Sequence, residues 1–185
     1  LLPLVINRGK GFAVKQGVIR SRGSYILMVD ADGATRIEDL IKVEKALKCD
    51  QQDRGVAIGS RAHLEAEDVV VQRKWYRNFL MKGFHFCVKY IAQIDDIRDT
   101  QCGFKLFTRE AAKKMFLNLH IDRWCMDIDL LRIAKHFKIP IAEECVNWHD
   151  VEGSKMTLRG MINMGIDLLL IRLFYMLKLW IIEEE

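Results

Sequence analysis

The chain has 185 residues, of which 50% are hydrophobic and 29% are charged, and its formal net charge is +4. This composition indicates one globular domain with a substantial core and excludes a disordered chain. The mild positive charge does not indicate a nucleic-acid partner, because the interleaved basic and aromatic residues of single-strand binders are missing from the sequence. The five cysteines form no Cys-x-x-Cys motif and are odd in number, which favours a reducing compartment over a disulfide framework or a zinc site.

Hydrophobic periodicity predicts helices that alternate with short strands along the chain. We expect helices at about 9–21, 36–48, 75–93, 109–117, 125–137 and 157–182. We expect strands at about 25–30, 55–60, 103–107 and 139–146, and a polar loop at 62–73. This alternation predicts an α/β fold with a mainly parallel sheet flanked by helices, in which ligands bind beyond the carboxyl ends of the strands.

Two carboxylates, Asp30 and Asp32, follow the apolar run 25–29 directly. Carboxylates two residues apart at the end of a strand can share one divalent cation. Mg²⁺ prefers oxygen ligands and keeps substrate phosphates in its shell. The alternative is a helix start, with Asp32 or Thr35 as the capping residue, and the triplet alone favours this second interpretation.

The segment Asn7-Arg8-Gly9-Lys10-Gly11 precedes this strand. Small residues and a basic pair at a helix start make a plausible phosphate cradle, although the P-loop pattern is absent. The alternative is a glycine turn that leads into a surface helix.

Further motifs follow in a fixed order: Gly59-Ser60-Arg61, the run 99–107, Arg123-Trp124, Asp127-Ile128-Asp129, the run 139–143 and Glu152-Gly153-Ser154-Lys155. Together with the two segments above, this series resembles the inverting family-two glycosyltransferases with a GT-A fold. Within them it is most similar to the polyprenyl-phosphate sugar transferases that glucosylate dolichyl phosphate. The similarity covers residues 4–180, and the ordered set is specific although no single motif is.

The resemblance implies transfer of glucose from UDP-glucose to dolichyl phosphate for protein N-glycosylation, with inversion and with Mg²⁺ or Mn²⁺ as cofactor. The implied location is the endoplasmic reticulum membrane, with the catalytic domain facing the cytosol. Two alternatives stay open. One is a related transferase that uses GDP-mannose or UDP-GlcNAc, and the other is a non-catalytic fragment that acts only as a binding module.

The candidate residues sort by ligand. The metal is expected at Asp30 and Asp32. The nucleotide sugar is expected at Asn7, Arg8, Lys10, Gly11 and Asp30, and the acceptor phosphate at Arg61, Arg73, Gln101, Lys105 and Lys155. Arginine suits phosphate because its planar fork binds in bidentate fashion, and Arg61 is the best candidate by motif.

Asp127 and Asp129 are the candidate catalytic carboxylates. In a helix Asp127 shares a face with Trp124 and Leu131, whereas Asp129 lies roughly 200° further round. We therefore expect that the two do not face one site, and we take Asp127 as the base-like or orienting carboxylate. The alternative for Asp129 is a surface ion partner of small energetic value.

The resemblance divides the chain into a partial GT-A-like catalytic domain at 1–156 and an amphipathic tail at 157–185. Members of the family carry an N-terminal anchor and a first strand that we do not find before the Asn-x-Gly-Lys-Gly segment. The tail is rich in leucine and aromatic residues, broken by Asp167, Arg172 and Lys178, which is typical of a helix at a membrane surface. The segment 79–91 offers a second such surface, with packing on the sheet as the equal alternative.

Overall fold

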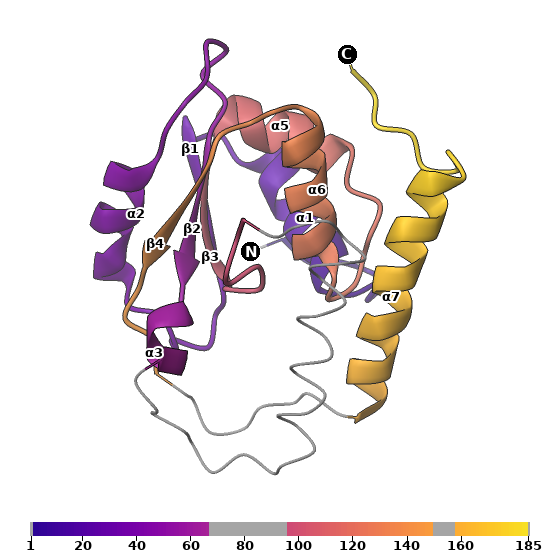
Figure 1. The fold of residues 1–185 in the computed structure, drawn as a ribbon, viewed down its shortest axis with the longest axis horizontal. Helices are drawn as coiled ribbons and strands as arrows, with labels where there is room; N and C mark the ends of the chain where they lie inside the picture. The colour runs from indigo at the N-terminus through magenta and orange to yellow at the C-terminus, as the bar shows by residue number, and fades with distance from the viewer. Residues whose placement is uncertain (1, 67–95, 150–157, 185) are drawn as a thin grey trace.

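The computed structural model describes residues 2–66, 96–149 and 158–184, which form a four-stranded sheet with helices on both faces (Figure 1). The strands are β1 (Tyr25–Val29), β2 (Val56–Ser60), β3 (Phe104–Thr108) and β4 (Ile141–Cys145). The helices are α1 (Lys10–Arg20), η1 (Ile37–Asp39, a 3-10 turn), α2 (Leu40–Ala46), α3 (Ala62–Ala66), α5 (Arg109–Leu117), α6 (Met126–His136) and α7 (Leu158–Met176). The predicted helix at 75–93 and the apolar segment 79–91 lie outside the described residues.

The sheet has the strand order β1-β3-β2-β4 and is mixed. β3 runs antiparallel to both β1 and β2, while β2 and β4 are parallel. The α/β fold is confirmed, but the sheet is mixed rather than mainly parallel, since β1–β3 and β2–β3 are antiparallel pairs although β1, β2 and β4 share one direction. Only the β2–β4 neighbours are a parallel pair, however, because β3 is inserted between β1 and β2. Strand alternation along the sequence cannot reveal such an insertion.

Alternate residues of each strand face two separate cores. Ile26, Met28, Val56 and Ile58 pack with α5 and α6 in the larger core. On the other face Ala57, Phe104 and Leu106 pack with Val43 of α2 in the smaller core. Figure 1 shows α2 on one side of the sheet and α1, α5 and α6 on the other. The period-2 pattern of strands explains this sorting.

The last helix, α7, lies against the α6 side of the molecule (Figure 1). Met164, Leu168 and Ile171 are buried in the larger core, and the Cys125 thiol donates to the carbonyl oxygen of Met164 at 3.3 Å. The opposite face exposes a stripe of apolar side chains that we call the α7 stripe: Ile162, Ile166, Leu169, Leu173 and Met176. α7 thus packs on the domain with one face and presents apolar surface with the other.

The helical tail is shorter than predicted. α7 ends at Met176, and Lys178 adopts a left-handed backbone with φ of 56°. That conformation stops a right-handed helix, so residues 177–182 continue as turns and coil. Among the described residues, every helix is too short or too polar to cross a bilayer.

A matched pair of substitutions on α7 tests the packed face. Leu168 is 0% exposed and Leu169 is 58% exposed. We expect Leu168→Ala to lower the free energy of unfolding by about 2–5 kcal/mol, because it leaves a cavity in the larger core. Leu169→Ala should change that free energy by about 0.5 kcal/mol or less. Urea denaturation followed by circular dichroism measures both, and equal losses would contradict the observed packing.

Candidate functional site

The sheet brings the sequence motifs to one edge. Val29 at the end of β1 pairs with Phe104 at the start of β3, and Ser60 at the end of β2 pairs with Cys145 at the end of β4. The segments that leave these positions carry Asp30, Arg61 and the loop 99–103. We call this the reaction edge. The prediction that the carboxyl ends of the strands gather the candidate residues is therefore supported by the strand register.

A backbone hydrogen bond and an ion pair hold Asp30 at the reaction edge. Its amide donates to the carbonyl oxygen of Gly103 at 2.9 Å, and its carboxylate lies 2.6 Å from the Nζ atom of Lys10. A Cβ atom on Gly103 would lie 2.0 Å from an oxygen of Asp30, so any larger residue there would have to displace the Asp30 side chain. The Lys10 ammonium also lies 5.6 Å from the ring centre of Trp124. Asp30 and Lys10 are thus brought together as predicted.

Asp32 is exposed, and its Oδ1 atom accepts a hydrogen bond from the Ala34 amide at 3.0 Å. This contact shapes the loop after β1. The helix that follows has Arg36 at its N-cap and no side-chain capping bond. The capping interpretation of Asp32 and Thr35 is therefore wrong. Thr35 instead forms a bridge with Trp148, which joins the loop after β1 to the segment after β4.

The glycines of the Asn-x-Gly-Lys-Gly segment serve close packing. A Cβ atom on Gly9 would lie 2.7 Å from the Asp122 carbonyl oxygen, and one on Gly11 would lie 2.5 Å from that of Ile121. Gly9 also has φ of 118°, which favours glycine. The segment is thus pressed against the loop 120–123. Of the residues in this segment that are expected to bind the nucleotide sugar, Lys10 reaches the reaction edge.

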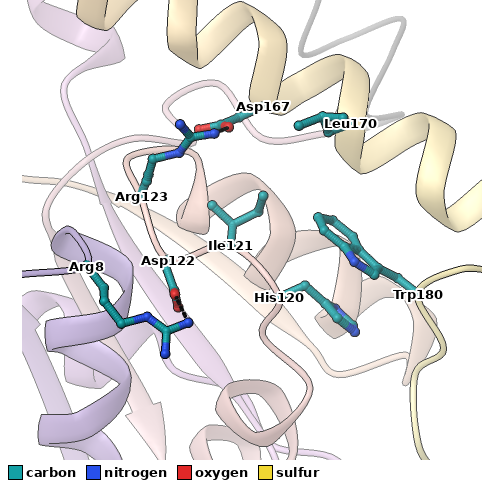
Figure 2. Close-up of a pocket in the computed structure, with 8 residues that line it drawn as sticks. All are labelled: Arg8, His120, Ile121, Asp122, Arg123, Asp167, Leu170 and Trp180. Atoms are coloured by element: carbon teal, nitrogen blue, oxygen red, sulfur yellow. Dashed lines mark hydrogen bonds and ion pairs between the residues drawn. The ribbon is translucent and has the colours of Figure 1, made fainter.

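Arg8 and Asn7 have other partners. Arg8 forms an ion pair with Asp122 at 2.6 Å, and the Asn7 side chain accepts from the Gly9 amide at 3.1 Å. The Arg8–Asp122 pair borders a pocket of about 390 Å³ between this segment, the loop 120–123 and the tail (Figure 2). The pocket is lined by Arg8, His120, Ile121, Asp122, Arg123, Asp167, Leu170 and Trp180. Arg8 therefore lines this pocket and pairs with Asp122, whereas Lys10 pairs with Asp30.

Arg61 lies where β2 ends and is paired with Asp99. Its Nε and Nη2 atoms donate to the Asp99 carboxylate at 2.7 and 2.9 Å, and its backbone amide donates to the same carboxylate at 2.9 Å. Burial opposes ionisation of Asp99, but the hydrogen bonds and charge of Arg61 outweigh it and hold the pKa of Asp99 below its ordinary value. Glu143 of β4 accepts the Asp99 amide at 2.9 Å and fixes the loop. The Arg61 guanidinium is therefore held in one orientation.

Lys105 and Asp127 form a buried pair beneath the reaction edge. The Lys105 Nζ atom lies 2.6 Å from Asp127 and donates to the Cys102 carbonyl oxygen, also at 2.6 Å. The two side chains are 1% and 4% exposed. This arrangement does not present Lys105 to an acceptor phosphate. The pair instead ties the loop 99–103 to the start of α6. Gln101 lies half-buried in that loop, and Arg73 and Lys155 lie outside the described residues.

Asp129 lies apart from Asp127, as predicted, but it is fully buried rather than on the surface. Its carboxylate accepts the backbone amides of His120 and Ile121 at 2.8 and 3.3 Å and the Tyr175 hydroxyl at 2.8 Å. Burial raises the pKa of Asp129. The His120 ring stacks on Trp180 with centres 4.8 Å apart. Asp129 therefore anchors the tail to the loop 120–123.

Sequence reasoning missed the partners of these residues. Asp99 and Glu143 orient Arg61, and Tyr175, His120 and Trp180 surround Asp129, but none of the five was a candidate. Asp99 and Glu143 fall in the motif runs 99–107 and 139–143, which was the available signal. Tyr175 and Trp180 lie far along the chain from Asp129, and His120 lies nine residues before it, but no motif marks these three.

The fold and the reaction edge define an α/β protein that gathers paired carboxylates and cations beyond the carboxyl ends of its strands. The chain is 52% identical over 188 residues to human dolichyl-phosphate beta-glucosyltransferase, which covers 100% of this chain and 57% of the relative. It is 49% identical over 186 residues to the Dictyostelium discoideum protein of the same name, with 100% and 57% covered. The Saccharomyces cerevisiae protein of that name is 44% identical over 183 residues, with 94% and 54% covered.

The chain is therefore homologous along its whole length to part of the dolichyl-phosphate beta-glucosyltransferases, which confirms the resemblance predicted from its motifs. The chain spans a little over half the length of these relatives. No protein-family model matches it.

The Asp99–Arg61 pair predicts a pH-dependent stability. Because the folded pKa of Asp99 lies below 3.8, its stabilisation is present above that pH and is lost as the pH falls through the lowered folded value. We expect Asp99→Asn to cost about 1–3 kcal/mol near neutral pH, since it removes the charged partner of a guanidinium whose side chain is 33% exposed. The unfolding midpoints of wild type and Asp99→Asn in urea should begin to converge as the pH falls toward 3.8, and they should converge further as it falls through the lowered folded pKa. A constant difference would contradict this role.

Removing the hydroxyl of Tyr175 tests whether Asp129 anchors the tail to the loop 120–123. We expect Tyr175→Phe to lower the free energy of unfolding by about 1–3 kcal/mol, because it leaves a buried carboxylate oxygen without its donor. Tyr25→Phe is the matched control, since Tyr25 is 53% exposed. Hydrogen exchange followed by mass spectrometry should show faster exchange in residues 118–125 of Tyr175→Phe. Unchanged exchange in that loop would argue against the anchor.

Proposed function

We propose that the protein transfers glucose from UDP-glucose to dolichyl phosphate, with inversion and with the acceptor phosphate as nucleophile. The relatives with this name support the proposal, because the chain matches them along its whole length at about 50% identity. The observation that carries it is the placement of Asp30, Lys10 and Arg61 at one edge of the sheet. Carboxylates and cations at a single edge suit a donor diphosphate and an acceptor phosphate.

Asp30 and Asp32 are the proposed ligands of Mg²⁺ or Mn²⁺. Both follow β1, Asp32 is exposed, and their oxygen atoms are the donor type that hard cations prefer. In the described residues, no group of three or more acidic, cysteine or histidine side chains is able to hold a metal. Two carboxylates then suit a cation whose remaining ligands are diphosphate oxygens and water. When bound, the cation would neutralise charge on the leaving diphosphate.

Lys10 is proposed to serve the same diphosphate. Its ammonium already lies at the reaction edge, half-enclosed between Asp30 and the Trp124 ring. A cation fixed beside a carboxylate ligand can contact phosphate oxygens that share that ligand's metal. Asn7, Arg8 and Gly11 then act by holding the segment that carries Lys10, rather than by contact with the nucleotide sugar.

Arg61 is proposed to bind the acceptor phosphate, with Gln101 in the adjacent loop as a second contact. Asp99 orients the guanidinium, and the Trp148 ring centre lies 5.4 Å from its Cζ atom. A phosphate monoester has a second pKa of about 6 and is mostly ionised at neutral pH. A strong general base is therefore unnecessary, and we assign no proton transfer to Asp127 or Asp129.

A lipid-linked acceptor calls for a membrane-facing surface, and the α7 stripe offers one. Its exposed isoleucine, leucine and methionine side chains follow a spacing of three and four residues along α7. A helix with such a stripe can lie in the lipid interface. We propose that α7 rests on the cytosolic face of the endoplasmic reticulum membrane. The division at residue 157 between catalytic domain and tail is part of this proposal.

The donor site gives the first test. We expect calorimetry to detect UDP-glucose binding to the 185-residue chain in the presence of Mn²⁺, and EDTA to abolish it. Asp32→Asn should lower glucose transfer to dolichyl phosphate at least about 100-fold, since it removes a metal ligand. Asp53→Asn, the same change in an exposed turn before β2, is the matched control and should leave transfer unchanged.

The contrary results separate the alternatives. A folded chain that fails to bind UDP-glucose, together with an active full-length relative carrying the same motifs, would support the non-catalytic fragment. Tighter binding of GDP-mannose or UDP-GlcNAc would support a different sugar donor. Full activity of Asp32→Asn would remove the metal role.

A further inference from the structure

A second concave site lies between the C-terminal half of α6 and the segment that follows α7. Its volume is about 630 Å³. We call it the basic groove, and its lining residues are Arg132, Lys135, His136, Tyr175, Lys178, Trp180, Ile181 and Ile182. The groove thus combines three permanently charged cations with aromatic and aliphatic walls. None of these residues belongs to the reaction edge.

The charges of the groove are only partly compensated. Arg132 is half-buried and its Cζ atom lies 4.5 Å from the Tyr175 ring centre. Among residues 2–66, 96–149 and 158–184, no carboxylate forms an ion pair with Arg132 or with Lys178. Lys135 is paired with Asp96, and the His136 ring lies 3.9 Å from the exposed Glu184.

The buried acid three residues before Arg132 in α6 is Asp129. Its carboxylate accepts the hydroxyl of Tyr175 and two backbone amides, and in the described part of the chain it attracts the Arg132 charge without forming an ion pair with it. Arg132 lines the groove beside the Tyr175 ring. A half-buried guanidinium of this kind favours an anionic ligand, because planar N–H donors match phosphate oxygens.

Apolar surface continues from the groove toward solvent. Ile181 lines the groove and is 69% exposed, and Leu177 and Leu179 beside it are 54% and 63% exposed. These residues extend the α7 stripe beyond the end of the helix. The complementary ligand therefore has an anionic group joined to an apolar chain.

The groove is separate from the proposed acceptor site. Asp127 at the start of α6 is paired with Lys105 beneath the reaction edge, whereas Lys135 follows eight residues later in the same helix. That separation is about 12 Å along the helix axis at 1.5 Å per residue. The groove also shares no lining residue with the proposed acceptor contacts Arg61 and Gln101, so we treat its ligand as distinct from the phosphate that reacts.

We propose that the basic groove binds the phosphate headgroup of an anionic membrane phospholipid, with the lipid chain against Ile181 and the neighbouring leucines. The inference rests on the proposed membrane contact of α7 and gives it a lipid preference. Basic residues are attracted to an anionic bilayer surface. Trp180 and Tyr175 are of the aromatic types that are enriched at membrane interfaces. The groove would fix how α7 lies on the membrane.

Vesicle flotation tests the proposal. The wild-type chain should float with phosphatidylcholine vesicles and bind more tightly when phosphatidylserine is added. We expect Arg132→Gln/Lys178→Gln to lower the partition coefficient into phosphatidylserine-containing vesicles about 25-fold, at about fivefold per charge. Binding of this variant to pure phosphatidylcholine should not change, because the α7 stripe is intact.

Two variants control for charge and folding. Lys45→Gln/Lys48→Gln removes the same charge from exposed positions at the end of α2, on the other side of the sheet, and should keep wild-type binding. Lys178→Gln alone changes an exposed residue and should lower anionic binding about fivefold in a folded chain. Thermal unfolding confirms that each variant is folded.

Three results would contradict the proposal that the basic groove binds an anionic phospholipid. These are equal anionic binding by wild type and the groove variant, an equal loss in the Lys45/Lys48 variant, and release from the vesicles by inorganic phosphate alone. Wild type that floats with neither vesicle while still transferring glucose in detergent would refute the membrane contact and the groove but leave the transferase intact. Anionic binding without UDP-glucose binding would leave the groove intact and refute the transferase in this chain.

Discussion

The loop 118–125 is the constraint on which the rest of the molecule depends, and the buried carboxylate of Asp129 holds it. Asp129 takes two amides from this loop and the hydroxyl of Tyr175 from α7. An isolated carboxylate in the core would be costly, so each of these donors is needed to keep it there. One buried group thereby fixes both the loop and the last helix. Arg123 pairs with the buried Asp167 of α7 and strengthens the same connection.

The other side of this loop supports the reaction edge. The Phe12 amide donates to the Asp122 carbonyl oxygen at 2.9 Å, and Gly9 and Gly11 allow the backbones to touch. This contact positions Lys10, whose ammonium forms an ion pair with Asp30. The tail and the reaction edge thus share one loop, with the tail on one surface and the Asn-x-Gly-Lys-Gly segment on the other. In the proposed function, membrane contact and donor binding are joined through the same short stretch of backbone.

Local sequence patterns predicted most of the helices and strands but not the residues and strands that they contact. The helix at 109–117 was predicted correctly from its periodicity, and in the structure the Thr108 side chain caps it by accepting the Ala111 amide at 3.3 Å. Helical geometry likewise separated Asp127 from Asp129. Burial of Asp129 was not predictable, because its partner Tyr175 is 46 residues away and the packing of α7 decides the outcome. The same limit hid the pairing of Lys105 with Asp127 and the position of β3 inside the sheet.

The cations of the reaction edge come with carboxylates already in place. Lys10 has Asp30, Arg61 has Asp99, and Lys105 has Asp127. The depth of each pair decides what it can do: the Lys105 pair is 1% and 4% exposed, while Lys10 and Asp30 are 21% and 40% exposed. Removing one partner of the buried Lys105 pair would leave a charge that neither solvent nor an ion partner stabilises. The outer pair of Lys10 and Asp30 is partly exposed, so its members can change partners at small cost in free energy. In the proposed reaction a diphosphate arriving with its cation supplies an anion for Lys10 and a positive charge for Asp30 together. The buried pair then holds the frame, and the outer pair is the one that meets substrate.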